Sequence, residues 1–349
     1  MTLPATTPAA TPAETPPTQY KIALEEHYEM HIDEAVTHLL AESEGFDPDY
    51  LAGVTRRLQD IDLRVEEMDR NGISLMIISP SPPGPEMATD ANQAMDLARR
   101  TNDHAAGLVA RHPDRLRAFA AVPLQDPDKG ADELERAVED LGFVGALING
   151  FTNIGDEDTA QYLDEPRVEP FWARVEELGV PVYLHPRPPL PSMRTAYRGY
   201  RGLNGSAWGF NVETGTHALR LMLSGLFDRH PGINVIIGHM GEMLPFQLPR
   251  VDRRLRELRP GTHGNHQKLP TEYLRDNFYI TTAGVFQTST LVNALMEVGV
   301  DRVLFSVDTP WESADECCEW FDNCPINPND RRKIAHGNAE GLFNLPAPK

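Results

Sequence analysis

Residues 21–27 read KIALEEH, an apolar segment that ends on two potential metal ligands, Glu25 and His27. Three later segments have the same plan: PVYLH ends on His185, NVIIGH on His239 and RVLFSVD on Asp308. A buried strand is apolar along its length, so a polar group at its C-terminal end faces a mouth and not the core. In a parallel barrel all these ends converge on one face, where active sites lie. The four segments therefore predict a barrel that gathers metal-type donors at one end.

Apolar runs rich in β-branched residues alternate with helical patterns along the rest of the chain. The runs predict about eight strands, at residues 20–27, 73–80, 116–124, 143–150, 180–185, 233–239, 278–284 and 302–308. Apolar residues at helical spacing predict helices at 62–70, 91–111, 132–141, 168–178 and 213–227. This alternation indicates an α/β fold, a single-domain (β/α)₈ TIM-type barrel over residues 20–349. Long inserted loops are expected at 31–60 and 186–210, where substrate contacts and lids are common.

The bulk properties exclude several classes of protein. The 349 residues carry a net charge of −20, which argues against nucleic acid or a membrane surface as a partner, since both need basic patches. No apolar run is long enough to cross a bilayer. Residues 1–19, rich in Pro, Thr and Ala, lack a signal-peptide pattern and are expected to be a disordered tail. Three clustered cysteines, Cys317, Cys318 and Cys324, form no disulfide framework and indicate a reducing, cytoplasmic location.

The candidate donors form a chemically consistent set. Residues i and i+2 of a strand share a face, so Glu25 and His27 are expected to point together and Glu26 away from them. Taken singly, each group has an ordinary explanation: a salt bridge for Glu25 and His27, a buried core histidine for His185 or His239. Asp308 follows an apolar strand, and a buried carboxylate needs a cation, an arginine or a helix N-terminus beside it. Together, carboxylates and imidazoles suit one divalent ion such as Zn²⁺ or Mn²⁺.

Several longer motifs carry a family resemblance that runs from about residue 21 to residue 345. The motifs are ALEEH, LHPRPP, IIGHMGE, FSVDTPWE, HGNAEGLF and the segment 208–231. The chain resembles the metal-dependent decarboxylases of the amidohydrolase superfamily, in particular the branch of γ-resorcylate and 2,3-dihydroxybenzoate decarboxylases. Aminocarboxymuconate-semialdehyde decarboxylase is a more distant relative of this branch. Many members of the superfamily begin with His-x-His, whereas Glu25-x-His27 resembles the decarboxylase branch.

The resemblance assigns roles to individual residues. It implies that Glu25, His27, His185 and Asp308 hold the metal, and that Asp308 also delivers a proton. His239 with Glu242 would form a catalytic pair beside it. Arg250 falls where the family places a substrate-binding arginine, although on the sequence alone a surface salt bridge is the preferred explanation. Trp311, also expected at the substrate, replaces a phenylalanine common in the family, and Ala283-Gly284-Val285-Phe286 replaces a more usual Ser-Gly-Asn-Phe; both changes bear on which aromatic acid fits.

The expected activity is non-oxidative, metal-dependent decarboxylation of a hydroxybenzoate-type acid, reversible as carboxylation of a phenol. The same barrel and metal also support hydrolysis of a lactone or cyclic amide, so a hydrolase is the first alternative. A non-catalytic barrel is the second, but such a protein would be expected to lose a ligand, and every expected position here is filled. By analogy with relatives, the chain is expected to form a homodimer or homotetramer.

Overall fold

The computed structural model describes residues 20–30, 45–259 and 261–345, so the expected tail at 1–19 lies outside the described residues. Eight parallel strands form a three-stranded sheet, in the order β1-β2-β3, and a five-stranded sheet, in the order β10-β9-β8-β7-β4. Their bounds are β1 Lys21–Tyr28, β2 Ile73–Pro80, β3 Leu116–Ala118, β4 Ala146–Asn149, β7 Val182–His185, β8 Val235–Ile237, β9 Phe278–Thr281 and β10 Val303–Leu304. A small antiparallel hairpin, β5 (Thr152–Asn153) and β6 (Ala160–Gln161), follows β4.

The two sheets approach each other at both ends through isolated contacts, in the arrangement of the expected (β/α)₈ barrel. A parallel bridge between Ala120 and Ala146 connects the chain after β3 to β4. At the other seam, no strand ladder joins β10 to β1 within the described residues. Instead the backbone N–H of His27 donates to the carbonyl of Thr309 over 2.7 Å, and side chains make the other contacts. The predicted fold class is therefore confirmed, with an irregular closure between the first and last strands.

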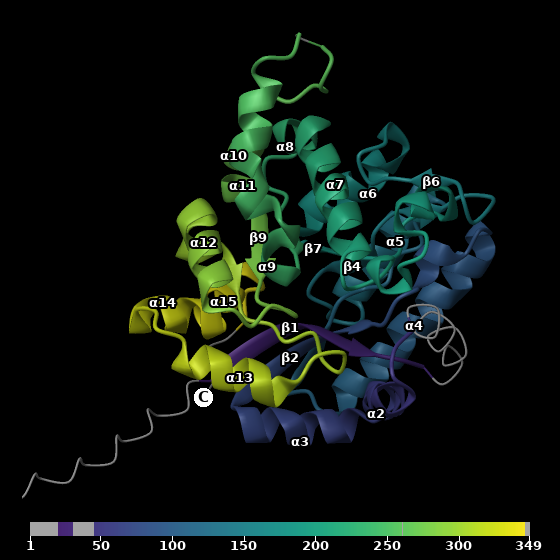
Figure 1. Ribbon diagram of the computed structural model, residues 1–349. Coiled ribbons are helices and arrows are strands. Elements are labelled where there is room, and N and C mark those ends of the chain that lie inside the picture. The colour runs from purple at the N-terminus through teal and green to yellow at the C-terminus, as the bar shows by residue number, and fades with distance from the viewer. Residues whose placement is uncertain (1–19, 31–44, 260, 346–349) are drawn as a thin grey trace, which may run out of the picture.

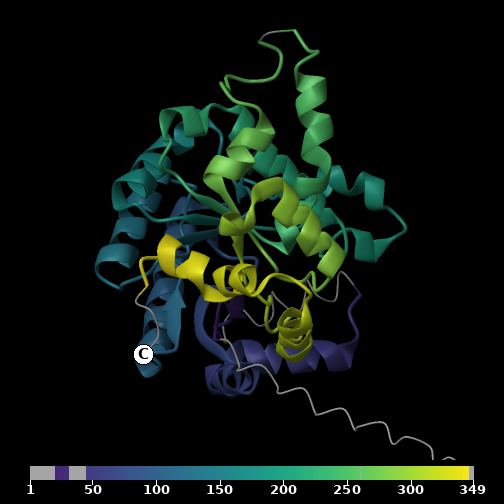
Figure 2. The same cartoon turned by 90° about the vertical axis from the view of Figure 1, so that its left-hand side faces the viewer.

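The helices cover the outside of the strands, as Figures 1 and 2 show. The α-helices are α2 Pro48–Gln59, α3 Ile61–Asn71, α4 Ala91–Arg111, α5 Pro127–Glu139, α6 Glu169–Leu178, α7 Gly209–Leu223, α8 Leu226–Arg229, α9 His239–Glu242, α10 Leu244–Leu255, α11 Pro270–Asn277, α12 Thr288–Val298, α13 Ala314–Asn323, α14 Pro328–Arg332 and α15 Asn338–Leu342. Short 3₁₀ turns occur at Pro85–Met87, Pro166–Val168, Pro191–Tyr197, Arg201–Leu203 and Val300–Arg302, and a π turn at Lys333–Gly337. The end of α10 and the loop after it extend away from the barrel in both views.

The predicted elements differ from the observed ones mainly at their ends. Residues 91–111 form α4 as predicted, whereas the strand predicted at 302–308 is reduced to Val303–Leu304. It stops early because the next two amides bond elsewhere: the Phe305 N–H donates to the Ile334 carbonyl and the Ser306 N–H to the Thr282 hydroxyl, each over 2.9 Å. The expected loop at 31–60 contains helix α2, and residues 31–44 of it lie outside the described residues. The expected loop at 186–210 contains the two 3₁₀ turns Pro191–Tyr197 and Arg201–Leu203 and ends in α7.

A β-bulge in β1 decides which side chains reach the mouth of the barrel. The barrel interior is filled by one apolar cluster with members from most strands: Ile22, Leu24, Ile77, Phe119, Leu147, Tyr183, Ile236 and Leu304. Strict alternation from Ile22 and Leu24 would turn Glu26 inward. However, Ala23 pairs with Met76 and Glu26 with Ile78, so β1 has one extra residue between these pairs. The extra residue reverses the alternation and turns Glu25 and His27 inward.

Candidate active site

Three buried donors meet at the C-terminal ends of β1 and β7. The ligand atoms of Glu25, His27 and His185 all lie within 4.8 Å of one another. His185 Nε2 is 3.4 Å from Glu25 Oε1. Strand geometry explains the meeting, since Glu25 and His27 follow the bulge on one face of β1, and His185 ends β7, as predicted from the sequence. An N₂O donor set of this kind suits a divalent transition ion.

Two atoms of this cluster are buried without a hydrogen bond of acceptable geometry. They are Glu25 Oε1 and His27 Nε2. The other oxygen of Glu25 accepts from the hydroxyl groups of Tyr183 and Thr281, so only Oε1 is left facing the cluster. A buried polar atom without a partner is costly. A cation held between these atoms would satisfy both, so the residues present fit the metal that the sequence predicts.

A chain of hydrogen bonds behind the cluster fixes the tautomer of His185. Its Nδ1 lies 2.9 Å from Asn149 Oδ1. The amide group of Asn149 is oriented by Glu86, which accepts from the Asn149 backbone N–H over 2.9 Å and faces its Nδ2 at 3.4 Å. Since the Asn149 oxygen can only accept, His185 Nδ1 carries the proton and Nε2 presents its lone pair to the cluster. Such outer partners orient metal-binding histidines.

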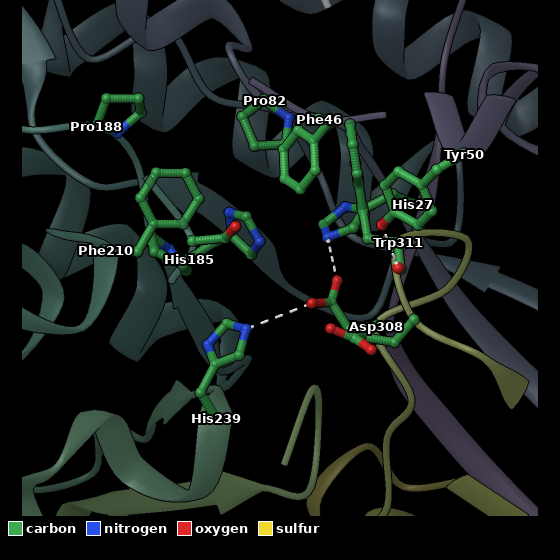
Figure 3. A pocket seen from close by; sticks show the side chains of 13 residues that line it. His27, Phe46, Tyr50, Pro82, His185, Pro188, Phe210, His239, Asp308 and Trp311 are labelled. Atoms are coloured by element: carbon green, nitrogen blue, oxygen red, sulfur yellow. Dashed lines mark hydrogen bonds and ion pairs between the residues drawn. The ribbon is translucent and has the colours of Figure 1, made fainter. Parts of the chain in front are cut away.

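His239 and Asp308 form a second group beside the donors, drawn in Figure 3. Asp308 Oδ2 lies 3.4 Å from His239 Nε2, and its Oδ1 lies 3.3 Å from His27 Nε2. His239 Nδ1 is 2.8 Å from Glu242 Oε1, so the two side chains are in contact, and their role as a catalytic pair stays a prediction. The turn that holds them is unusual, because His239, Met240 and Glu242 all have positive φ angles of 49–55°. Backbone strain of this kind in non-glycine residues is concentrated at functional sites.

The charges of the two groups differ because their partners differ. Burial and the neighbouring His27 hold the pKa of His185 well below its usual value, so His185 is neutral. Burial alone would lower the pKa of His239, but Glu242, Glu25 and Asp308 raise it well above its usual value. Burial would raise the pKa of Asp308, but the neighbouring imidazoles of His239 and His27 hold it below its usual value. At neutral pH the metal-free site therefore contains a His239 imidazolium beside an Asp308 carboxylate.

A cavity of about 130 Å³ opens above these groups. A single water needs roughly 10–15 Å³ on the same measure, so the cavity has room for a small organic molecule. Its lining residues are His27, Phe46, Tyr50, Pro82, His185, Pro186, Pro188, Ser206, Phe210, His239, Asp308, Trp311 and Glu312. In Figure 3, Phe46, Tyr50 and Trp311 lie on one side and Phe210 and Pro188 on the other. Apolar walls with polar groups at one end are suited to a flat ring that carries charged substituents.

The structure places most residues predicted from the sequence at this cavity. Trp311 lines it, and the Tyr50 hydroxyl donates to the Trp311 carbonyl over 2.5 Å. Asp308 lies next to the three-donor group, and its predicted role as a fourth ligand stays a prediction. Arg250 does not line this cavity; it is exposed on α10, near Phe246. The role of Arg250 at a substrate therefore also stays a prediction.

Several functional residues were not predicted. Asn149 ends β4, a strand that the sequence did predict. A search for polar residues at strand ends would have found it if amide side chains had been counted with carboxylates and imidazoles. Tyr183 lies two residues before His185 on the same face of β7, which was a second available signal. Phe46, Tyr50 and Phe210 lie in or next to the long loops, and no periodic pattern identifies which aromatic side chains of a loop turn inward.

The chain is similar in sequence and structure to proteins of a known enzyme family. Residues 28–345 match the amidohydrolase family. The chain is 48% identical to γ-resorcylate decarboxylase of Rhizobium radiobacter over 94% of its own length and 99% of the relative's. A crystal structure of 2,6-dihydroxybenzoate decarboxylase complexed with 2,6-dihydroxybenzoate superposes with a TM-score of 0.89 at 46% identity, and covers 94% of this chain and 100% of that one. A dihydroxybenzoic acid decarboxylase from Polaromonas sp. JS666, with bound manganese and the inhibitor 2-nitroresorcinol, gives 0.88 at 46% identity over 94% and 97% of the two chains.

A barrel with a buried N₂O donor set at its C-terminal face defines a class of metal-dependent enzymes. This chain belongs to the amidohydrolase family. The resemblance inferred from the sequence motifs is therefore confirmed.

Among the described residues, none of the helices combines the length and apolar character that crossing a membrane requires. The three cysteines are free and buried, as the sequence suggested.

Proposed function

We propose that this protein is a carboxy-lyase that decarboxylates a hydroxybenzoate-type aromatic acid without an oxidant. The observation that carries the proposal is the buried Glu25, His27 and His185 cluster next to the His239–Asp308 pair, at the polar end of an aromatic-lined cavity. The 48% identity to γ-resorcylate decarboxylase over nearly the whole chain supports it. We propose Mn²⁺ or Zn²⁺ as the ion, with Mn²⁺ favoured because manganese is bound in the Polaromonas relative.

The chemical problem is to avoid an aryl carbanion when CO₂ leaves. Protonating the ring carbon that carries the carboxylate, before the C–C bond breaks, avoids that species. When bound by Glu25, His27 and His185, a divalent ion would supply a Lewis acid that polarises the substrate. The residues of the chain must then hold the ring flat and deliver one proton to one carbon.

The geometry suits Asp308 for this delivery. The Asp308 carboxylate faces the cavity, and its Oδ2 lies 3.4 Å from His239 Nε2. In the metal-free site, Glu242, Glu25 and Asp308 raise the pKa of His239, which suits its Nε2 as the source of the proton. The proton passes from His239 Nε2 to Asp308 Oδ2 and then to the ring carbon. The C–C bond breaks, CO₂ leaves, the electron pair restores the aromatic ring, and His239 takes up a new proton from solvent.

Other residues are proposed to bind and orient the substrate. The Trp311, Phe46 and Phe210 rings can enclose the faces of one aromatic ring and exclude water. Arg250 is proposed to pair with the polar edge of the substrate. We further propose a cytoplasmic homodimer or homotetramer, on the basis of the family resemblance and the buried free thiols.

The experiment is a substrate screen with metal control. Purified protein is stripped of metal, reloaded with Mn²⁺ or Zn²⁺, and offered 2,6-dihydroxybenzoate, 2,3-dihydroxybenzoate and salicylate. Release of CO₂ from at least one acid, lost on stripping and restored by metal, is the expected result. Full activity of the stripped protein would remove the metal from the mechanism. Hydrolysis of a lactone or cyclic amide without CO₂ release from any acid would replace the proposed function by the hydrolase alternative.

A further inference from the structure

A second buried polar cluster lies directly behind the active site, between β1 and the segment that follows β10. Its members are Glu26, Arg64 from α3, Ser306 and Thr309, and each is at most 1% exposed. None of them lines the cavity. The cluster lies at the seam where the strand ladder is missing, and it encloses the backbone of Asp308.

The Glu26 carboxylate binds the chain on both sides of Asp308. Its Oε1 accepts from the backbone N–H of Val307 over 3.0 Å and from the Ser306 hydroxyl over 3.1 Å. Its Oε2 accepts from the backbone N–H of Thr309 over 3.1 Å and also from the Thr309 hydroxyl. The two residues that flank Asp308 are therefore attached, through their amides, to one buried carboxylate.

The backbone between these two amides has an unfavourable conformation. Asp308 has a φ of 80°, which a residue with a Cβ rarely adopts. Such a conformation persists only where the surroundings hold it. The amides of Val307 and Thr309 provide that hold, because moving Asp308 toward ordinary strand geometry would break at least one of their bonds to Glu26. The left-handed turn directs the Asp308 side chain between His27 and His239, as Figure 3 shows.

Arg64 connects the same carboxylate to the metal-binding strand. Its Nη1 donates to the His27 carbonyl over 2.8 Å, and its Nη2 lies 3.5 Å from Glu26 Oε2 and donates to the Thr309 hydroxyl. The guanidinium group thus holds the end of β1 and the segment after β10 at a fixed separation. It also provides the charge that a buried carboxylate requires.

We propose that Glu26, supported by Arg64, is a positioning residue that sets the Asp308 carboxylate relative to His27 and His239. Glu26 acts through the backbone of Asp308 and touches neither substrate nor metal. A purely structural role as a clasp between the first and last strands is the competing explanation. The two explanations differ in what they predict for properly folded, metal-loaded protein.

The test compares Glu26→Gln with a matched control in the full-length, Mn²⁺-loaded enzyme. Glutamine preserves the shape but places an NH₂ group against N–H and O–H donors, so one side of the Asp308 turn loses its attachment. The control is Glu133→Gln, because Glu133 is also buried and accepts hydrogen bonds from Arg136 over 2.7 Å and Asn102 over 2.8 Å, away from the cavity. Both variants lose a carboxylate bound by arginine, and only one of them adjoins Asp308.

Three readouts are measured: kcat, KM, and the electron paramagnetic resonance spectrum of bound Mn²⁺. For Glu26→Gln, kcat at saturating metal is expected to fall about 10–100-fold, with KM within about threefold, since outer partners of a metal site typically have effects of this size. The Mn²⁺ spectrum is expected to change, because the Asp308 carboxylate moves relative to Glu25, His27 and His185. Glu133→Gln is expected to leave kcat and the spectrum unchanged even where its thermal stability falls.

A pair of variants at Thr309 keeps the proposal testable if Glu26→Gln does not fold. Thr309→Val removes only the hydroxyl between Glu26 and Arg64, whereas Thr309→Ser retains it. We expect kcat to fall in Thr309→Val and to stay near the wild-type value in Thr309→Ser. The proposal is overturned if Glu26→Gln keeps kcat within threefold and an unchanged spectrum, if Glu133→Gln loses kcat equally, or if the two Thr309 variants behave alike.

This inference rests on the proposed function only where kcat and KM are measured; the Mn²⁺ spectrum does not depend on the substrate. If the wild-type protein decarboxylates none of the acids offered, the proposed function fails. The Mn²⁺ spectrum of Glu26→Gln against wild type then still decides whether Glu26 positions Asp308.

Discussion

Replacing Asp308 with asparagine tests the centre of the proposed mechanism. The carboxylate lies between two imidazoles, with Oδ1 3.3 Å from His27 Nε2 and Oδ2 3.4 Å from His239 Nε2. Asparagine has nearly the same shape, and the backbone bonds that hold the turn do not involve the Asp308 side chain. The fold and the cavity are therefore expected to survive, while the group that carries the proton is lost.

The magnitude follows from what the carboxylate does. A positioned proton donor contributes roughly 10²–10⁴ to a rate, which corresponds to about 2.7–5.4 kcal/mol at 1.36 kcal/mol for each factor of ten. Asparagine also leaves the His239 imidazolium without one of the charges that raise its pKa. We therefore expect kcat to fall by about 100–10,000-fold, with kcat/KM falling in parallel because the lost interaction is made in the transition state.

The assay is CO₂ release by Mn²⁺-saturated protein, with metal content measured for each sample. Asp252→Asn is the matched control, since Asp252 is a buried aspartate on α10 that accepts from the Thr271 N–H over 3.3 Å and does not line the cavity. A kcat for Asp308→Asn within about tenfold of wild type, in metal-loaded protein, would refute the assignment of Asp308 as the proton donor.

Three further predictions concern the metal and the ring. Burial raises the pKa of Glu25 to about 7 in the metal-free protein, and a ligand must lose its proton to bind, so the Mn²⁺ dissociation constant should rise about tenfold for each pH unit below that value; titrations that show no dependence between about pH 5.5 and 7 would contradict this. Asn149→Ala removes the acceptor of the His185 Nδ1 proton at 2.9 Å and should weaken Mn²⁺ binding about 10–100-fold by calorimetry; an unchanged affinity would mean that His185 needs no such partner. Trp311→Ala should raise KM several-fold with a smaller effect on kcat, since an aromatic contact is worth roughly 0.5–1.5 kcal/mol. An unaltered KM in steady-state kinetics would mean that the substrate ring does not contact Trp311.

The sequence predicted the barrel because burial leaves a strong pattern. Strands such as Ile73–Pro80 and Val182–His185 are apolar on both faces, and the polar residue at the end of each donor strand is visible without any structure. The positions of Glu25, His27, His185 and His239 follow from that rule, whereas the pairing of His239 with Glu242 came from the family resemblance. These residues lie on or directly after strands, where the backbone direction is fixed.

The rest depends on features that have no simple pattern. The bulge between Ala23 and Glu26 decides the inward face of β1, and nothing in KIALEEH marks the extra residue. The early end of β10 results from hydrogen bonds of the Phe305 and Ser306 amides to Ile334 and Thr282, which no local propensity reveals. The cavity walls formed by Phe46 and Phe210 depend on the course of long connections, where side-chain direction is set by tertiary packing.

The irregular seam between the first and last strands also bears on how the protein is made. Glu26 and Ser306 are 280 residues apart. Glu25 and His27, next to Glu26, therefore leave the ribosome long before Ser306. At roughly 5–20 residues per second, tens of seconds of synthesis separate β1, which carries Glu25 and His27, from Asp308. A nascent chain therefore lacks the full set of side chains at the cavity until its first and last strands meet.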